Sequence, residues 1–372
     1  MKKGFFSVTL RDRVYGFFML YHLAAFLQHF FSPLNVVHYV SFRMMWAFLA
    51  AFCMSLLWGE RFITTSRRYF RAGLREHLPD THAVKEGMPT MGGLFIIAIV
   101  IGAALLLCRW SAYEVWIALS ALVGFGAVGF WDDYAKVRTG RGISERKKFY
   151  AQWAVAGGVA LCWYFLAHPS TRLCIPLFKD FQPDLGIFFI LWVAYILVAT
   201  SNAVNLTDGL DGLAIGSLIL NFATFSVIAY LAGHHLFADY LHIPYAGSAE
   251  IAVLAAALVG ASCGFLWYNA YPAQIFMGDV GSLSLGAALG IIALMTKQEL
   301  LLPITGGLFV LETVSVIVQV FSYKMWKVRV FRMAPFHHHL ELRGWPESKI
   351  AVRFALITVV LCLIGLMLLK IR

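Results

Sequence analysis

The sequence predicts an all-α polytopic membrane protein with about ten transmembrane helices. Of its 372 residues, 60% are hydrophobic and only 13% are charged, and the mean hydropathy is +0.74. Soluble domains average roughly 45–50% apolar and roughly 25% charged residues. The apolar residues fall in stretches near the ~20 residues that a helix needs to cross a bilayer. A membrane β-barrel would show shorter, alternating segments.

The apolar stretches divide the chain into ten expected spans within a single domain, residues 1–372. One further stretch, 15–32, carries His22, Gln28 and His29, so we expect an interfacial helix there, within an N-terminal extension of residues 1–35. The ten spans are 38–58, 90–108, 113–131, 149–167, 185–203, 212–232, 249–269, 277–296, 300–322 and 351–370.

The positive charges predict the orientation of the spans. The loops 59–89, 132–148 and 323–350 each hold six Lys or Arg residues, and the alternate loops hold at most two. Basic loops stay on the cytoplasmic side, so both termini are expected to be periplasmic. The basic N-terminal residues oppose this orientation mildly. The net charge of +10 is explained by topology, and no nucleic-acid partner is expected.

Polar sequence interrupts the apolar pattern in five places. All five lie at span ends that the charge pattern assigns to the cytoplasm. Polar residues beside membrane spans are costly and therefore indicate function, so we expect a functional site on the cytoplasmic face. The stretches are GMPTMGG (87–93), WDDYAK (131–136), NAVNLTDGLDGL (202–213), FMGDVGSL (276–283) and APFHHHLE (334–341).

The acidic residues in these stretches allow two interpretations. Asp132 and Asp133 precede Lys136 by one turn, which fits a solvated helix end with charge pairing. Paired acids can also hold a divalent cation or share a proton so that one acts as a base. Asp279 lies between two glycines at the start of a span. It could cap that helix or bind a metal ion that also holds a phosphate.

The stretch 202–213 predicts a ligand-binding surface. Asn202, Asn205, Asp208 and Asp211 recur every third residue, so helical backbone would place them on one face. The alternative is a polar cap for a helix that begins at Leu213. A cap needs one or two of these side chains and leaves the others unexplained.

Three consecutive histidines, His337, His338 and His339, lie near the C-terminal end. On a helix they would fan out by about 100° per residue, so they cannot converge on one zinc ion. We expect one or two of them to donate hydrogen bonds to phosphate oxygens at the edge of the bilayer, near Arg332 and Lys327.

Taken together, the motifs resemble those of the polyprenyl-phosphate N-acetylhexosamine-1-phosphate transferase superfamily, and within it the bacterial phospho-N-acetylmuramoyl-pentapeptide transferase (MraY) type. The resemblance extends from about residue 30 to Arg372. One departure is Met88, where the family usually has threonine. The motifs are PTMGG (89–93), DDYAK (132–136), NAVNLTDGLDGLA (202–214), FMGDVGSL (276–283) and MAPFHHHLELRGW (333–345).

The resemblance implies a Mg²⁺-dependent homodimeric enzyme of the bacterial inner (cytoplasmic) membrane. Such an enzyme transfers phospho-MurNAc-pentapeptide from its UDP carrier to undecaprenyl phosphate, giving lipid I and UMP in peptidoglycan synthesis. One alternative is the related transferase of GlcNAc-1-phosphate. Another is a cation-coupled transporter, which would place its ionisable residues near the bilayer midplane instead of at one end of the spans.

The resemblance also implies roles for individual residues. Asp132, Asp133 and Asp279 would be catalytic, with Asp279 as the metal ligand and Asp132 as a base or phosphate-orienting acid. The substrate-binding residues would be Lys85, Thr90, Lys136, Lys148, Asn205, Asp208, Asp211, Asn269, Phe276, Gln319, His337, His338 and His339.

Overall fold

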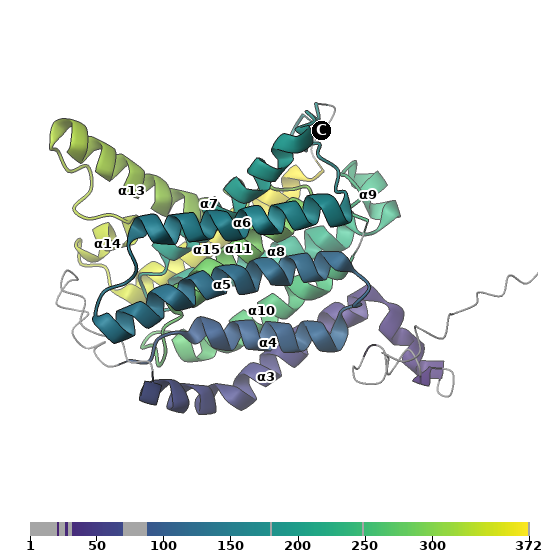
Figure 1. The fold of residues 1–372 in the computed structure, drawn as a ribbon, viewed down its shortest axis with the longest axis horizontal. Helices are drawn as coiled ribbons and strands as arrows, with labels where there is room; N and C mark the ends of the chain where they lie inside the picture. Colours follow the sequence, from purple (N-terminus) through teal and green to yellow (C-terminus); the bar gives the residue numbers. More distant parts are fainter. Residues whose placement is uncertain are drawn as a thin grey trace, which may run out of the picture.

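The computed structural model describes residues 21, 27–28, 32–69, 88–178, 181–247 and 249–370, and it is nearly all helical (Figure 1). Over these residues, nine helices are long and apolar enough to cross a membrane, and Gly92–Leu107 is a shorter apolar helix. No strand forms in the described part of the chain, where Arg172 and Asp184 make an isolated bridge. The prediction of an all-α polytopic membrane protein is confirmed.

Each of the ten expected spans coincides with helical structure, and the span 300–322 is divided between the short helix α12 and α13. Lys85 and most of the 1–35 extension, including nearly all of the expected interfacial helix, lie outside the described residues. The elements are η1 (Ser32–His38), α3 (Val40–Tyr69), α4 (Gly92–Leu107), α5 (Tyr113–Thr139), α6 (Glu145–Ala167), η3 (Gly186–Phe188), α7 (Phe189–Thr207), α8 (Leu213–Ala232), α9 (His235–Leu241), α10 (Glu250–Asn269), α11 (Gly278–Met295), α12 (Leu302–Thr305), α13 (Gly307–Trp326), α14 (Phe336–Glu341) and α15 (Glu347–Leu368).

Helices α10 and α11 form the buried centre of the bundle. Nearly every residue of both is buried, whereas α3, α6, α13 and α15 expose many apolar side chains on their outer faces. Small residues allow α10 to approach α3 closely: a Cβ on Gly260 would lie 2.2 Å from the carbonyl oxygen of Phe48. This close approach is typical of helices packed in a membrane.

A buried ion pair fixes the end of the bundle away from the polar stretches. Arg43 of α3 donates to both carboxylate oxygens of Glu250 at the start of α10, at 2.6 and 2.7 Å. Glu250 also accepts the backbone N–H of Arg109, just after α4, at 3.0 Å. The charges therefore compensate each other while they join three helices.

Helix α13 differs from its neighbours because it projects from the bundle (Figure 1). Its last residues, among them Met325 and Trp326, are largely exposed. The chain then returns along α13 to the short helix α14 before it enters α15. This arm carries the three histidines back to the polar end of the bundle.

Candidate functional site

The first and fourth polar stretches bind each other through their backbones. The N–H groups of Gly92 and Gly93 donate to the carbonyl oxygens of Phe276 and Met277, both at 2.9 Å, and Phe276 N–H donates to Pro89 at 3.0 Å. The loop before α4 is therefore held against the start of α11.

The third polar stretch contacts the fourth and the fifth. Asn205 donates to the Ser282 hydroxyl at 2.9 Å, and Asp211 accepts the backbone N–H of Ala273 at 3.1 Å. A Cβ on Gly209 would lie 2.2 Å from Nε2 of His337. These contacts, together with those of the acids below, place all five polar stretches at one end of the bundle.

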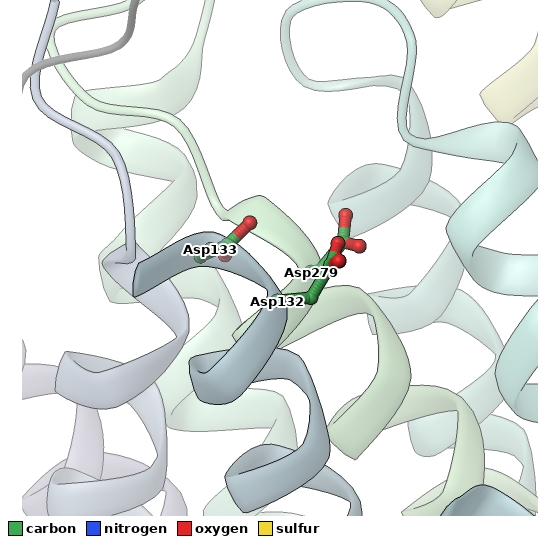
Figure 2. A group of neighbouring side chains, drawn as sticks. All are labelled: Asp132, Asp133 and Asp279. Atoms are coloured by element: carbon green, nitrogen blue, oxygen red, sulfur yellow. The ribbon is translucent and has the colours of Figure 1, made fainter. Parts of the chain in front are cut away.

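Three carboxylates meet at the centre of this end (Figure 2). Asp132 and Asp133 lie near the end of α5, and Asp279 lies in the first turn of α11. Each offers an oxygen within 4.8 Å of the others. Asp132 and Asp133 are buried, with exposed fractions of 3% and 4%. Asp279 does not cap α11, because the N-cap position is Met277, but a carboxylate in a first turn is stabilised by the helix dipole.

Glycines allow the two acidic helices to approach each other. A Cβ on Gly129 of α5 would lie 2.3 Å from the carbonyl oxygen of Asp279. Gly278 has φ +71°, a left-handed conformation, and a Cβ there would lie 2.5 Å from Oδ2 of Asp133. Glycine is therefore required where the α5 carboxylate reaches the start of α11.

Two lysines balance most of the negative charge. Nζ of Lys136 lies 2.7 Å from Asp132, 3.2 Å from Asp133 and 3.0 Å from Asp279. Lys148, from the first turn of α6, forms an ion pair with Asp279 and lies 3.6 Å from Asp132. Two unit charges 4 Å apart interact by about 4 kcal/mol at an effective dielectric of 20. The lysines thus offset the repulsion among two buried acids and one partly buried acid.

Backbone groups hold the two α5 acids in place. Asp132 accepts the N–H of Ile143 at 2.8 Å, from the loop that leads into α6. Asp133 accepts the N–H of Val280 at 3.2 Å. The directions of both carboxylates are therefore set by main-chain donors.

The donor set fits a hard divalent cation. Mg²⁺ binds oxygen ligands, usually one or two carboxylates completed by water and phosphate oxygens. Asp132, Asp133 and Asp279 supply only carboxylate oxygens, and the Lys136 ammonium already lies between all three. The site thus attracts positive charge at the point where the acids converge.

The other predicted site residues contact different parts of the polar end and of the returning arm. The Thr90 hydroxyl lies 3.0 Å from the Cβ position of Gly278. Asn269 accepts Gly212 N–H at 3.1 Å and donates to Ile275 at 2.9 Å, so its side chain joins two polar loops. Gln319 instead contacts the returning arm, where its side-chain amide binds both the backbone N–H and the carbonyl oxygen of Phe331.

The predicted single face of Asn202, Asn205, Asp208 and Asp211 is wrong. Helix α7 ends at Thr207, and Asp208 has φ −79° and ψ 56°, outside the helical region. Asn202 pairs with Gln152 of α6, Asn205 points to α11, and Asp211 binds the loop after α10. The four side chains therefore join different elements. The alternative start of a helix at Leu213 is confirmed, although its cap position is Gly212.

The three histidines are buried in α14 and do not form an exposed rim. His337 is fully buried against Glu312, His338 lies 2.6 Å from Glu341, and His339 accepts the N–H of Arg332 at 3.0 Å. Burial and two nearby arginines lower the pKa of His339, which favours its neutral form. The three histidines thus have different polar partners, although the rings of His337 and His338 contact each other with centroids 4.2 Å apart.

Sequence reasoning missed three residues of this region. Gln152 and Ser282 bind the amides of the third stretch. Glu312 lies in the middle of an apolar span and contacts α14. Glu312 carried a usable signal, because an ionisable residue within a membrane helix indicates function. Ser282 belongs to the fourth polar stretch but was not singled out within it, and Gln152 lies within an apolar span.

Comparison with known families agrees with this geometry. Residues 115–297, 183 of the 372 residues, match the model of glycosyl transferase family 4. This segment runs from the first turn of α5 to just past the end of α11 and includes all three clustered acids. The match supports the polyprenyl-phosphate hexosamine-1-phosphate transferase superfamily and, more generally, phospho-sugar transfer to a polyprenyl phosphate. Members of this family typically depend on a divalent metal.

Proposed function

We propose that this chain transfers phospho-MurNAc-pentapeptide from its UDP carrier to undecaprenyl phosphate, releasing UMP, at the cytoplasmic face of a bacterial inner membrane. The observation that carries the proposal is the group of Asp132, Asp133 and Asp279 with two lysines at one end of the helical bundle. The five connected polar stretches and the family match support it.

The charge arrangement suits a reaction between two anions. The acceptor is a lipid phosphate and the donor a diphosphate, so their repulsion must be lowered before they can meet. Lys136 and Lys148 each carry three N–H donors, which can bind phosphate oxygens as well as carboxylates. Phosphoryl transfer depends mainly on such positioning and electrostatic stabilisation.

The acids have distinct proposed roles. Asp279 would hold the divalent ion, taken to be Mg²⁺. When bound, that ion would neutralise phosphate charge and stabilise the departing UMP. Asp132 would orient or deprotonate the acceptor phosphate. Asp133 would mainly fix the start of α11, because its Oδ2 is bound to Val280 N–H.

The membrane setting follows from the acceptor. Its polyprenyl tail stays in hydrocarbon while its phosphate reaches the polar end of the bundle. The loops rich in Lys and Arg would be cytoplasmic, and both termini would be periplasmic. The resemblance to the superfamily further implies that the protein acts as a homodimer.

The test is incubation of the purified full-length protein with UDP-MurNAc-pentapeptide, undecaprenyl phosphate and magnesium. We expect release of UMP and formation of the lipid-linked product, and no release when EDTA is added. UDP-GlcNAc offered in place of the muramoyl donor separates the related transferase, which the loop APFHHHLELRGW disfavours. Ion flux into liposomes without UMP formation would support a transporter instead.

A further inference from the structure

Helix α13 presents a polar stripe to the arm that returns from its tip. Glu312, Gln319 and Ser322 lie at spacings of seven and three residues, which places them on one helix face. Gln319 binds the backbone of Phe331, and Ser322 donates to the carbonyl oxygen of Val328 at 2.9 Å. The opposite side of α13 exposes apolar residues. The polar stripe therefore holds the segment 328–339 against α13.

Glu312 is the deepest residue of this stripe. It has no exposed surface. Its two carboxylate oxygens lie 3.2 and 3.3 Å from the backbone nitrogen of His337, which donates to both. Oε2 also lies 3.2 Å from Nδ1 of the same histidine. A buried carboxylate is costly unless such partners compensate it, so Glu312 and His337 fix each other.

His337 transmits this restraint to the third polar stretch. Its ring is fully buried, and neither ring nitrogen makes a hydrogen bond in the described part of the chain. Nε2 lies so close to Gly209 that a Cβ there would be 2.2 Å away. Gly209 follows Asp208 directly and precedes Asp211 by two residues. The imidazole thus packs against the middle of the Asp208–Asp211 turn.

We propose that Glu312 is a positioning residue, which sets the Asp208–Asp211 turn for the nucleotide sugar through His337. The inference rests on the proposed function for the identity of the ligand. Glu312 contacts His337 of α14, and His337 contacts Gly209 of the turn, so the effect of Glu312 on the ligand would pass through the histidine. Loss of Glu312 would let α14 shift and would release the turn.

Two substitutions separate positioning from packing. Glu312→Leu removes both acceptors at similar size, and Glu312→Gln keeps one acceptor for His337 N–H. The matched control is Ser315→Ala on the same buried face, since among the described residues Ser315 hydrogen-bonds the Glu312 carbonyl of its own helix alone. We expect Glu312→Leu to raise KM for the nucleotide sugar about tenfold with a smaller change in kcat. Glu312→Gln should stay within about threefold and Ser315→Ala within about twofold.

A double-mutant cycle tests the route through His337. If Glu312 acts through the histidine, Glu312→Leu combined with His337→Ala should be no worse than the worse single variant. Additive losses would overturn the inference. Equal losses in Glu312→Gln and Glu312→Leu would also overturn it, because they would assign the charge itself to the reaction.

Hydrogen exchange supplies a measurement that does not depend on turnover. Full-length Glu312→Leu should exchange the amides of residues 207–212 faster than wild type, while Ser315→Ala should not. Unchanged exchange there would overturn the positioning role whatever the activity. Absence of UMP release by the wild-type protein would instead contradict the proposed function and leave the exchange result standing.

Discussion

Asp133 on α5 accepts a hydrogen bond from the backbone N–H of Val280 on α11, at 3.2 Å. The acid of one helix therefore binds the first turn of another, next to Asp279. Because the donor is a main-chain group, the separation of the acids is set by how closely the two helices pack and not by long flexible side chains. This relationship makes the site sensitive to changes that touch no charged group.

Close packing of α4 against α11 gives the first prediction. A Cβ on Gly93 would lie 2.0 Å from the backbone nitrogen of Gly281, so Gly93→Ala must push the two helices apart. We expect a loss of stability on the order of 1–3 kcal/mol and loss of UMP release. Thermal unfolding in detergent and the transferase assay measure the two effects.

The matched control is Gly158→Ala in α6, where no atom of the described residues outside the local helix lies within 4 Å of the new Cβ. A glycine within a helix costs roughly 0.5–1 kcal/mol relative to alanine, so this variant should be equally or more stable and fully active. An active Gly93→Ala protein with a wild-type melting temperature would show that the α4–α11 approach is not needed.

The two neighbouring lysines of α6 give the second prediction. Lys148 pairs with Asp279, whereas Lys147 is exposed. Lys148→Ala should lower kcat by about 10²-fold, a loss typical of removing one electrostatic stabiliser. Lys147→Ala makes the same change in net charge and should leave kcat within about twofold. Equal effects of the two substitutions would mean that only the overall charge of the loop matters.

The far end of the bundle gives a third prediction, on stability alone. Glu250→Gln leaves the Arg43 guanidinium buried with a weakened partner, and breaking such a pair costs about 3–5 kcal/mol. The melting temperature should fall markedly, while kcat of the folded fraction should not change. Glu60→Gln on the exposed face of α3 serves as the control. A large drop in kcat at full stability would contradict the purely structural role of this pair.

The sequence was sufficient to predict the helices and the end of the bundle at which the polar stretches meet. Hydropathy and the positions of polar residues are local properties, and the bilayer leaves few alternatives to spanning helices. Asp132 and Asp279 are 147 residues apart in the sequence. Their convergence could be predicted because alternate span ends lie on the same side of the membrane. The close approach of these acids is confirmed.

Side-chain roles that depend on packing were predicted less well. Asn202 to Asp211 looked periodic in the sequence, but the helix ends at Thr207, so each side chain finds a different partner. The histidines looked like an exposed edge, yet α13 covers His337 with Glu312. Neither outcome could be predicted locally, because both depend on the path of an arm that returns from a distant helix tip.

The most direct measurement is magnesium-dependent UMP release by Asp279→Asn, with Asp239→Asn as the control. Asp239 is an exposed acid on α9 and lies outside the acidic group. Wild type and Asp239→Asn should respond alike to added magnesium, and Asp279→Asn should lose about 10²-fold or more in activity at every concentration. Wild-type UMP release by Asp279→Asn at low magnesium would contradict the account.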